Sequence, residues 1–116
     1  METETKEYFT IKEVAARLNE TEPTLRYWES EFQDTITPRR NERGVRFYTK
    51  KDIKDVELVQ YHLRDLGLTH DGARKKLKND KPASLKQMKA VQHLRTIKAE
   101  LKALATALGE AEKLAN

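Results

Sequence analysis

Signals for the start of a helix recur along this 116-residue chain and constrain its fold more than any other feature. Thr10-Ile-Lys-Glu13 and Ser84-Leu-Lys-Gln87 are capping boxes, in which two side chains satisfy backbone groups that have no partner at a helix start. Thr49-Lys-Lys-Asp52 carries the same kind of signal, and Thr21 and Thr69 are further N-cap residues. The sequence therefore predicts five helices and a mainly α fold.

The apolar residues within these helices recur at helical spacing. In the second helix, Leu25, Trp28 and Phe32 are spaced i, i+3 and i+7, which predicts a buried face. Trp28 could instead stack on a nucleic-acid base, but its spacing from Leu25 favours the core. Asn19 and Gly67, which tolerate a left-handed backbone, are expected to end the first and third helices. The other positions expected to face inward are Val14, Ala15, Leu18, Ile53, Val56, Val59 (or Gln60), Leu63, Leu66, Ala73 and Leu77.

The segment between the second and third helices changes to short extended pieces. Ile36–Arg40 and Val45–Tyr48 mix apolar with polar or basic residues, Gly44 can supply the positive φ of a turn between them, and Pro38 suits an edge strand. We expect a two-stranded hairpin in which Phe47 points inward and pins the hairpin to the core. A hairpin that follows two helices joined by a tight polar turn is the arrangement of a winged helix-turn-helix.

Basic residues are concentrated rather than spread evenly. The formal net charge is +4; residues 1–80 are balanced, with 16 Lys+Arg against 16 Asp+Glu, so residues 81–116 carry the excess with 7 against 3. Between Arg39 and Lys54, seven basic residues face two acidic ones, a local charge of +5 around the predicted turn. Such a segment suits contact with phosphate groups, although a solvated charged loop gives the same pattern.

The last predicted helix carries a heptad pattern. A helix of about thirty residues is roughly 45 Å long, which is longer than the preceding domain is wide. An exposed leucine stripe of this length favours a coiled coil with a second copy of the chain, whereas the alternative is that it folds back on the third and fourth helices. The heptads alone do not fix a parallel or antiparallel orientation. The seam residues are Leu94, Ile97, Leu101, Leu104 and Leu108, and upstream the stripe drifts through Leu85, Met88 and Val91 and could pack on the domain.

The sequence offers little support for a catalytic or metal site. Cysteine is absent, and the three histidines, His62, His70 and His93, show no ligand spacing, so neither a metal nor another cofactor is expected. There is no Ser/His/Asp or Cys/His set and no phosphate-binding glycine loop, which argues against an enzyme. The polar N-terminus and the short apolar runs predict neither a signal peptide nor a membrane span, and hence a soluble, cytoplasmic protein.

Five short motifs together resemble the MerR family of bacterial transcription regulators, over roughly seventy residues. They are Phe9-Thr-Ile-Lys-Glu-Val-Ala15, Thr24-Leu-Arg-Tyr-Trp-Glu29, Gly44-Val-Arg-Phe-Tyr48, Asp52-Ile53 and Leu66-Gly-Leu-Thr69. The resemblance implies a winged helix-turn-helix whose second helix enters the major groove of double-stranded DNA, with the wing on the flanking backbone. It also implies a homodimer joined by an antiparallel coiled coil of the C-terminal helices, bound to a pseudo-palindromic promoter site close to RNA polymerase.

The chain departs from the pattern of this family in two places. A longer segment, Ser30 to Thr37, precedes Pro38 where the family usually has a short glycine-leucine-leucine turn, so we expect an offset of the wing relative to the second helix. Almost nothing follows the C-terminal helix, and the cysteines of metal-sensing members and the ligand-binding domain of drug-sensing members are absent. No inducer-sensing role is therefore expected.

The candidate DNA contacts fall in three regions. The recognition helix offers Thr24, Arg26 and Tyr27, although Arg26 could instead pair within its helix with Glu22 or Ser30. The contacts expected elsewhere are Tyr8, Thr10 and the weaker candidates Lys12 and Arg17 at the first helix, and Arg40, Arg43, Arg46 and Tyr48 in the wing. The expected organisation is a flexible N-terminus (1–7), a DNA-binding domain (8–79), a linker (80–83) and a dimerisation helix (84–116).

Two other functions fit the same features. An architectural or excisionase-like protein could use the domain to bend DNA without sensing a signal. Alternatively, an adaptor could bind a different protein through its C-terminal helix.

Overall fold

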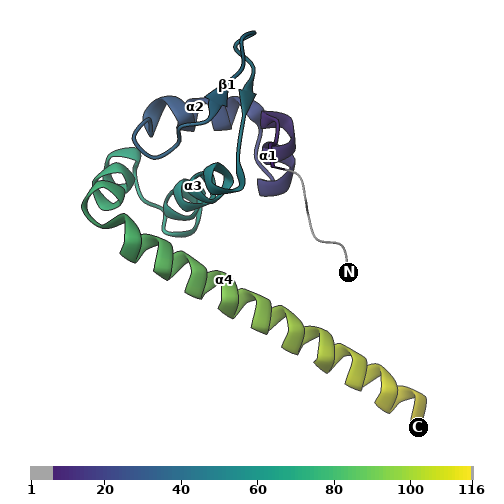
Figure 1. The fold of residues 1–116 in the computed structure, drawn as a ribbon. Helices are drawn as coiled ribbons and strands as arrows, with labels where there is room; N and C mark the ends of the chain where they lie inside the picture. The colour runs from purple at the N-terminus through teal and green to yellow at the C-terminus, as the bar shows by residue number, and fades with distance from the viewer. Residues whose placement is uncertain (1–6, 116) are drawn as a thin grey trace. The chain divides into compact units, whose positions relative to one another are not determined.

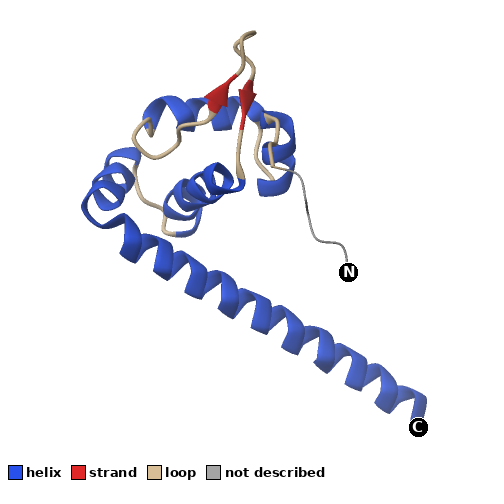
Figure 2. Ribbon diagram, in the orientation of Figure 1, coloured by secondary structure: helices blue, strands red, loops and turns tan. Residues whose placement is uncertain are grey.

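The computed structural model describes residues 7–115, and most of the expected N-terminal segment 1–7 lies outside them. Its architecture confirms the predicted class, with helices, a two-stranded wing and a long C-terminal helix (Figures 1 and 2). The described residues up to Lys81 form one compact unit, and those from Pro82 form another. The elements are α1 (Ile11–Leu18), α2 (Glu22–Glu31), β1 (Arg39–Arg40), β2 (Arg46–Phe47), α3 (Lys50–Gln60), a π-helical turn η1 (Tyr61–Asp65) and α4 (His70–Ala115).

The helix starts of the first unit confirm the capping signals. Thr10 Oγ1 accepts from the Glu13 N–H at 3.2 Å, and Glu13 Oε1 accepts from the Thr10 N–H at 3.1 Å. Thr49 and Asp52 form the same reciprocal pair at the start of α3. α1 ends at Asn19, whose φ of 56° is left-handed as expected.

The start of the long C-terminal helix differs from the prediction. α4 runs from His70 to Ala115 with one non-helical residue, Asp80, at φ −153° and ψ 68°. Pro82 follows within the first turn after this break, where a missing N–H costs no hydrogen bond. Ser84 therefore lies inside a helix that has already restarted, and the linker expected over residues 80–83 is reduced to a single non-helical residue.

The core of the first unit contains the predicted inward faces. Leu25, Trp28 and Phe32 are each at most 3% exposed. The other predicted positions that are buried are Val14, Ala15, Ile53, Val56, Val59, Ala73 and Leu77.

The turn η1 changes which residues of the third helix face inward. A π-helical turn holds more residues than an α-helical turn and rotates the side chains that follow. Tyr61 and His62 at its start continue the buried face of α3, whereas Leu66, which follows the turn and was expected in the core, is 36% exposed. Gly67 then ends the helix at φ 65°, as predicted.

The wing is shorter than predicted and is anchored by a different residue. β1 and β2 pair antiparallel with two residues each, and Gly44 in the turn has a φ of 77°. A backbone bridge joins Phe9 to Tyr48, with N–H···O distances of 2.8 and 2.7 Å. This bridge turns Tyr48 into the core at 0% exposure. Phe47, expected to point inward, is half-buried and packs edge-on against Tyr8 with ring centroids 5.1 Å apart.

The second unit presents its heptad seam to the surface. The seam side chains are between 37% exposed, at Ile97, and 63% exposed, at Leu94. Upstream, Met88 is buried, and Leu85 and Val91 are half-buried. In the part of the chain that is described, no helix is both long and apolar enough to cross a membrane.

His62 gives the fold a specific pH dependence. Its ring is fully buried, its Nδ1 lies 2.7 Å from the Leu58 carbonyl oxygen, and burial lowers its pKa. Below about pH 6.5 the unfolded chain therefore binds a proton that the folded chain does not, so the stability falls as the pH falls, by at most about 1.4 kcal/mol per pH unit. Urea unfolding at about pH 7 and pH 5 is expected to show a smaller loss for His62→Gln than for the unchanged chain. His93→Gln, at an exposed histidine, should keep the full loss, and an equal loss in His62→Gln contradicts the assignment.

Candidate nucleic-acid interface

The outward face of α2 carries the three side chains predicted to read DNA. Tyr27 is 54% exposed and Arg26 is also exposed, whereas Thr24 is half-buried with its hydroxyl 2.8 Å from that of Thr21. Arg26 Nη2 lies 3.4 Å from Glu22 Oε1, which is the intrahelical pair considered as an alternative. Because both partners are exposed, this pair contributes little, and the guanidinium can exchange it for another acceptor.

The start of α1 is less open to an anion than expected. The hydroxyl of Thr10 and the carboxylate of Glu13 already bond to each other and to N–H groups there. Lys12 is exposed, but Arg17 lies over the ring of Phe9, with Cζ 4.7 Å from its centroid. This region therefore offers Lys12 and the 47% exposed Tyr8 as its most accessible groups.

The wing arginines divide into two kinds. Arg43 lies at the exposed turn, where Asn41 Oδ1 accepts the N–H groups of Arg43 at 2.9 Å and Val45 at 3.0 Å. Arg40 and Arg46 instead bond to one carboxylate, that of Glu29 on α2. Sequence reasoning did not select Glu29, although it ends the motif that contains Arg26 and Tyr27.

The prediction for Tyr48 is wrong. Because its side chain is completely buried, its hydroxyl cannot reach a phosphate. Among residues 7–115 this hydroxyl has no hydrogen-bond partner. Burial raises the pKa of Tyr48 to about 12. The physical reason is the bridge to Phe9, which directs the side chain inward at the base of the wing.

The turn between α1 and α2 is fixed to α3 and η1. Gln60 Nε2 donates to the Leu18 carbonyl at 2.7 Å and to Glu20 Oε2 at 2.9 Å, and Arg64 Nη2 donates to Glu20 Oε1 at 2.8 Å. Burial alone would raise the pKa of Glu20, but the hydrogen bonds from Arg64 and Gln60 outweigh it and hold the pKa below its usual value. These contacts set the position of the two helices relative to the rest of the first unit.

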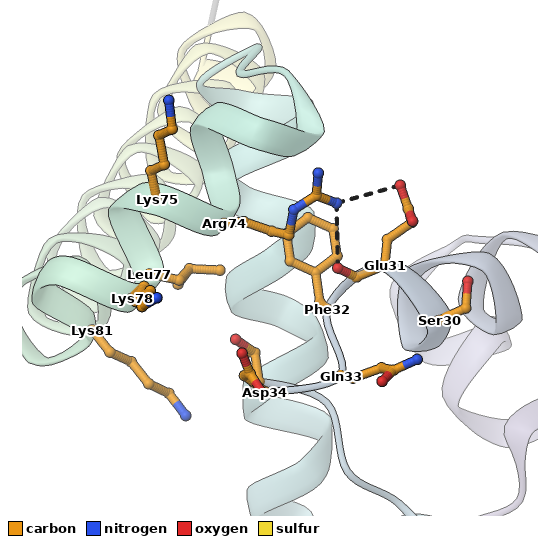
Figure 3. A pocket seen from close by; sticks show the side chains of 11 residues that line it. Ser30, Glu31, Phe32, Gln33, Asp34, Arg74, Lys75, Leu77, Lys78 and Lys81 are labelled. Carbon is orange, nitrogen blue, oxygen red and sulfur yellow. Dashed lines mark hydrogen bonds and ion pairs between the residues drawn. The ribbon is translucent and has the colours of Figure 1, made fainter.

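Two hollows flank the C-terminal end of α2. The smaller, about 280 Å³, lies against the wing and is lined by Arg26, Glu29, Ser30, Gln33, Ile36, Thr37, Pro38, Arg40 and Arg46. The larger, about 590 Å³, lies against the first turns of α4, and Arg74 crosses it to reach Glu31 Oε1 at 3.3 Å (Figure 3). The larger hollow contains none of the predicted DNA contacts, whereas the smaller contains three of them. Across the described residues, no three His, Cys, Asp or Glu side chains gather as metal ligands.

Comparison with known proteins identifies the family. Residues 9–80 match the family described as MerR HTH family regulatory protein. The chain is 34% identical over 92 residues to the regulator protein TubY of Clostridium botulinum C phage, an alignment that covers 79% of this chain and 38% of that protein. The chain thus spans well under half the length of this relative.

Two solved structures share the fold. One is HiNmlR, a MerR family regulator lacking the sensor domain and bound to promoter DNA, with a TM-score of 0.54, 21% identity and 91% coverage of both chains. The other is a MerR family transcriptional regulator from Bacillus cereus, with a TM-score of 0.53, 23% identity, and coverage of 91% of this chain and 78% of that one. Since the family match extends over more than half of the chain, the protein belongs to the MerR family of helix-turn-helix regulatory proteins.

Proposed function

We propose that the protein is a dimeric, sequence-specific regulator of transcription that binds double-stranded DNA. The observation that carries this proposal is the hollow between α2 and the wing, which Arg26, Arg40 and Arg46 all line. Three guanidinium groups around one hollow, from a helix and a hairpin, are suited to a polyanion.

The helix and the wing then have different tasks. α2 enters the major groove, where Arg26 can bond to a base edge or a phosphate and the exposed hydroxyl of Tyr27 can bond to a phosphate. The wing lies on the flanking backbone, with Arg43 at its exposed turn. HiNmlR, a MerR family regulator with the same fold, is bound to promoter DNA in its structure, which supports binding to duplex DNA.

The heptad seam allows a second copy of the chain, with a second recognition helix, to join the first. Five seam side chains are exposed in the isolated chain, and a monomer rarely leaves a continuous apolar stripe in water. A homodimer through an antiparallel coiled coil covers the stripe and places two copies of α2 on a pseudo-palindromic site. Binding at a promoter brings the protein close to RNA polymerase and places it in the cytoplasm, with the nucleoid.

Replacing Arg26 and replacing Arg43 are expected to affect DNA binding in different ways. Arg26→Ala should lose about 1–3 kcal/mol on the preferred site if the guanidinium reads a base, with little loss on unrelated duplexes. Arg43→Ala should weaken binding to all duplexes and lower the slope of log K against log salt by about one. Titrations of both variants on a preferred and a scrambled duplex at several salt concentrations check this. Unchanged affinity and site preference in Arg26→Ala contradict the recognition-helix assignment.

The function itself is tested by selection of bound sequences from random duplex DNA. Enrichment of two related half-sites at fixed spacing is the expected result, and no enrichment overturns sequence-specific binding. A promoter fused to a reporter then distinguishes a regulator from a protein that only bends DNA, because only a regulator changes transcription from the site it occupies.

A further inference from the structure

Glu29 joins both strands of the wing to α2. Its carboxylate accepts from Arg40 Nη2 at 3.0 Å through Oε1 and from Arg46 Nε through Oε2. Arg40 and Arg46 are opposite each other in the register of β1 and β2. One carboxylate on α2 therefore binds both strands of the hairpin, at one cross-strand pair.

Exposure separates the two arginines. The side chain of Arg46 is 21% exposed and that of Glu29 is 15% exposed, whereas that of Arg40 is 49% exposed. A guanidinium has five donors, so Arg40 keeps most of its donors for another acceptor after bonding to Glu29. Arg46 is too sheltered to do the same without leaving its partner.

The hollow lined by Glu29, Arg40 and Arg46 has a positive net charge, which favours binding of an anion. Its lining contains three arginines and one carboxylate, a formal net charge of +2. A backbone phosphate carries a single negative charge and accepts several hydrogen bonds from guanidinium groups.

We propose that Glu29 is a positioning residue for the wing and that Arg40 and Arg46 have separate roles. Arg46 stays on Glu29 and fixes the wing against α2, while Arg40 directs its free donors to one backbone phosphate in the hollow. This inference rests on the proposed binding of duplex DNA and adds to it that a carboxylate next to the DNA strengthens the complex. Simple electrostatics predicts the opposite, because a negative charge repels phosphate.

The test compares Glu29→Gln with Glu42→Gln, each of which removes one negative charge. Glu42 is exposed in the turn of the wing and is the matched control. Binding of the full chain to a duplex of arbitrary sequence, about three helical turns long, is measured by fluorescence anisotropy between about 50 and 200 mM salt. Glu29→Gln is expected to weaken binding about three- to tenfold at every salt concentration, whereas Glu42→Gln leaves it unchanged or slightly tighter.

Three further variants separate positioning from general loss of structure. Glu29→Asp keeps the charge and is expected to recover most of the affinity. The double variant Glu29→Gln/Arg46→Gln should bind no more weakly than either single variant, since both remove the same contact. Arg40→Gln should lower the salt slope by about one. Thermal unfolding of each variant establishes that binding is measured on folded protein.

The outcomes distinguish the inference from the function on which it rests. Binding by Glu29→Gln that equals or exceeds that of the unchanged chain overturns the positioning role while duplex binding stands. A double variant weaker than both single variants shows that Arg46 acts independently of Glu29 and also overturns it. Absence of salt-dependent duplex binding by the unchanged chain overturns the proposed function itself.

Discussion

Trp28→Ala is expected to cost about 3–5 kcal/mol of the free energy of unfolding, because it empties a buried aromatic site. Trp28 is 3% exposed and lies between Leu25 and Phe32, which are each 2% exposed. A domain of this size is stabilised by only about 5–15 kcal/mol. The loss is therefore a large fraction of the total stability, and Trp28→Ala should unfold at a clearly lower urea concentration than the unchanged chain.

The neighbouring residue provides the matched control. Tyr27 is 54% exposed, and its main ring contact is His70, with centroids 5.2 Å apart. Tyr27→Ala is expected to change stability by less than about 1 kcal/mol, as for other surface positions, and to lower DNA affinity with the fold intact. Urea unfolding followed by circular dichroism measures both variants. A larger loss in Tyr27→Ala than in Trp28→Ala would mean that the two faces of α2 are assigned the wrong way round.

The parts of this fold that the sequence predicts are those set by local interactions. Thr10 and Glu13 satisfy each other's backbone groups within one turn, so four residues are enough to recognise the start of α1. Asn19 and Gly67 end helices through their own backbone preferences. The buried face of α2 follows from spacing within a single helix. None of these inferences depends on where the rest of the chain lies.

The parts that sequence reasoning missed depend on distant contacts. Alternation along β2 placed Phe47 inward, but the bridge between Phe9 and Tyr48 decides which of the two neighbours is buried. Glu29 gains its importance only when the wing folds back on α2, since its partners are 11 and 17 residues away. Burial of Tyr48 likewise removes a candidate DNA contact that its position in the motif suggested.

The turn η1 was missed for a related reason, and the break in α4 at Asp80 lies within the predicted linker but is shorter than expected. Either a linker or a continuous helix fits Asn79 to Ala83, because Pro82 is compatible with the first turn of a helix. The extra residue in η1 has no pattern of its own, and its effect is seen only in the exposure of Leu66. The sequence therefore predicted which arginines belong to the candidate site, but not that two of them form ion pairs with Glu29.

The dimer seam allows the second large effect to be tested. Leu101 and Leu104 are 62% and 56% exposed, and Leu114, which lies one position off the seam, is 89% exposed. Burying a leucine side chain contributes about 1.5–3 kcal/mol, and a dimer buries these two positions from both copies. The double variant Leu101→Lys/Leu104→Lys is therefore expected to raise the dimer dissociation constant by several orders of magnitude, whereas Leu114→Lys leaves it nearly unchanged.

Dissociation of the dimer should affect DNA binding only where two half-sites are offered. Linking two recognition helices adds an effective concentration that strengthens binding about 10²- to 10⁴-fold over one copy. The seam variant should lose this factor on a duplex with two half-sites and bind a single half-site as the unchanged chain does. Sedimentation equilibrium and anisotropy measure the two effects separately. If the unchanged chain sediments as a monomer at micromolar concentration, the exposed leucines must meet a different protein, and the half-site spacing is then set by that partner.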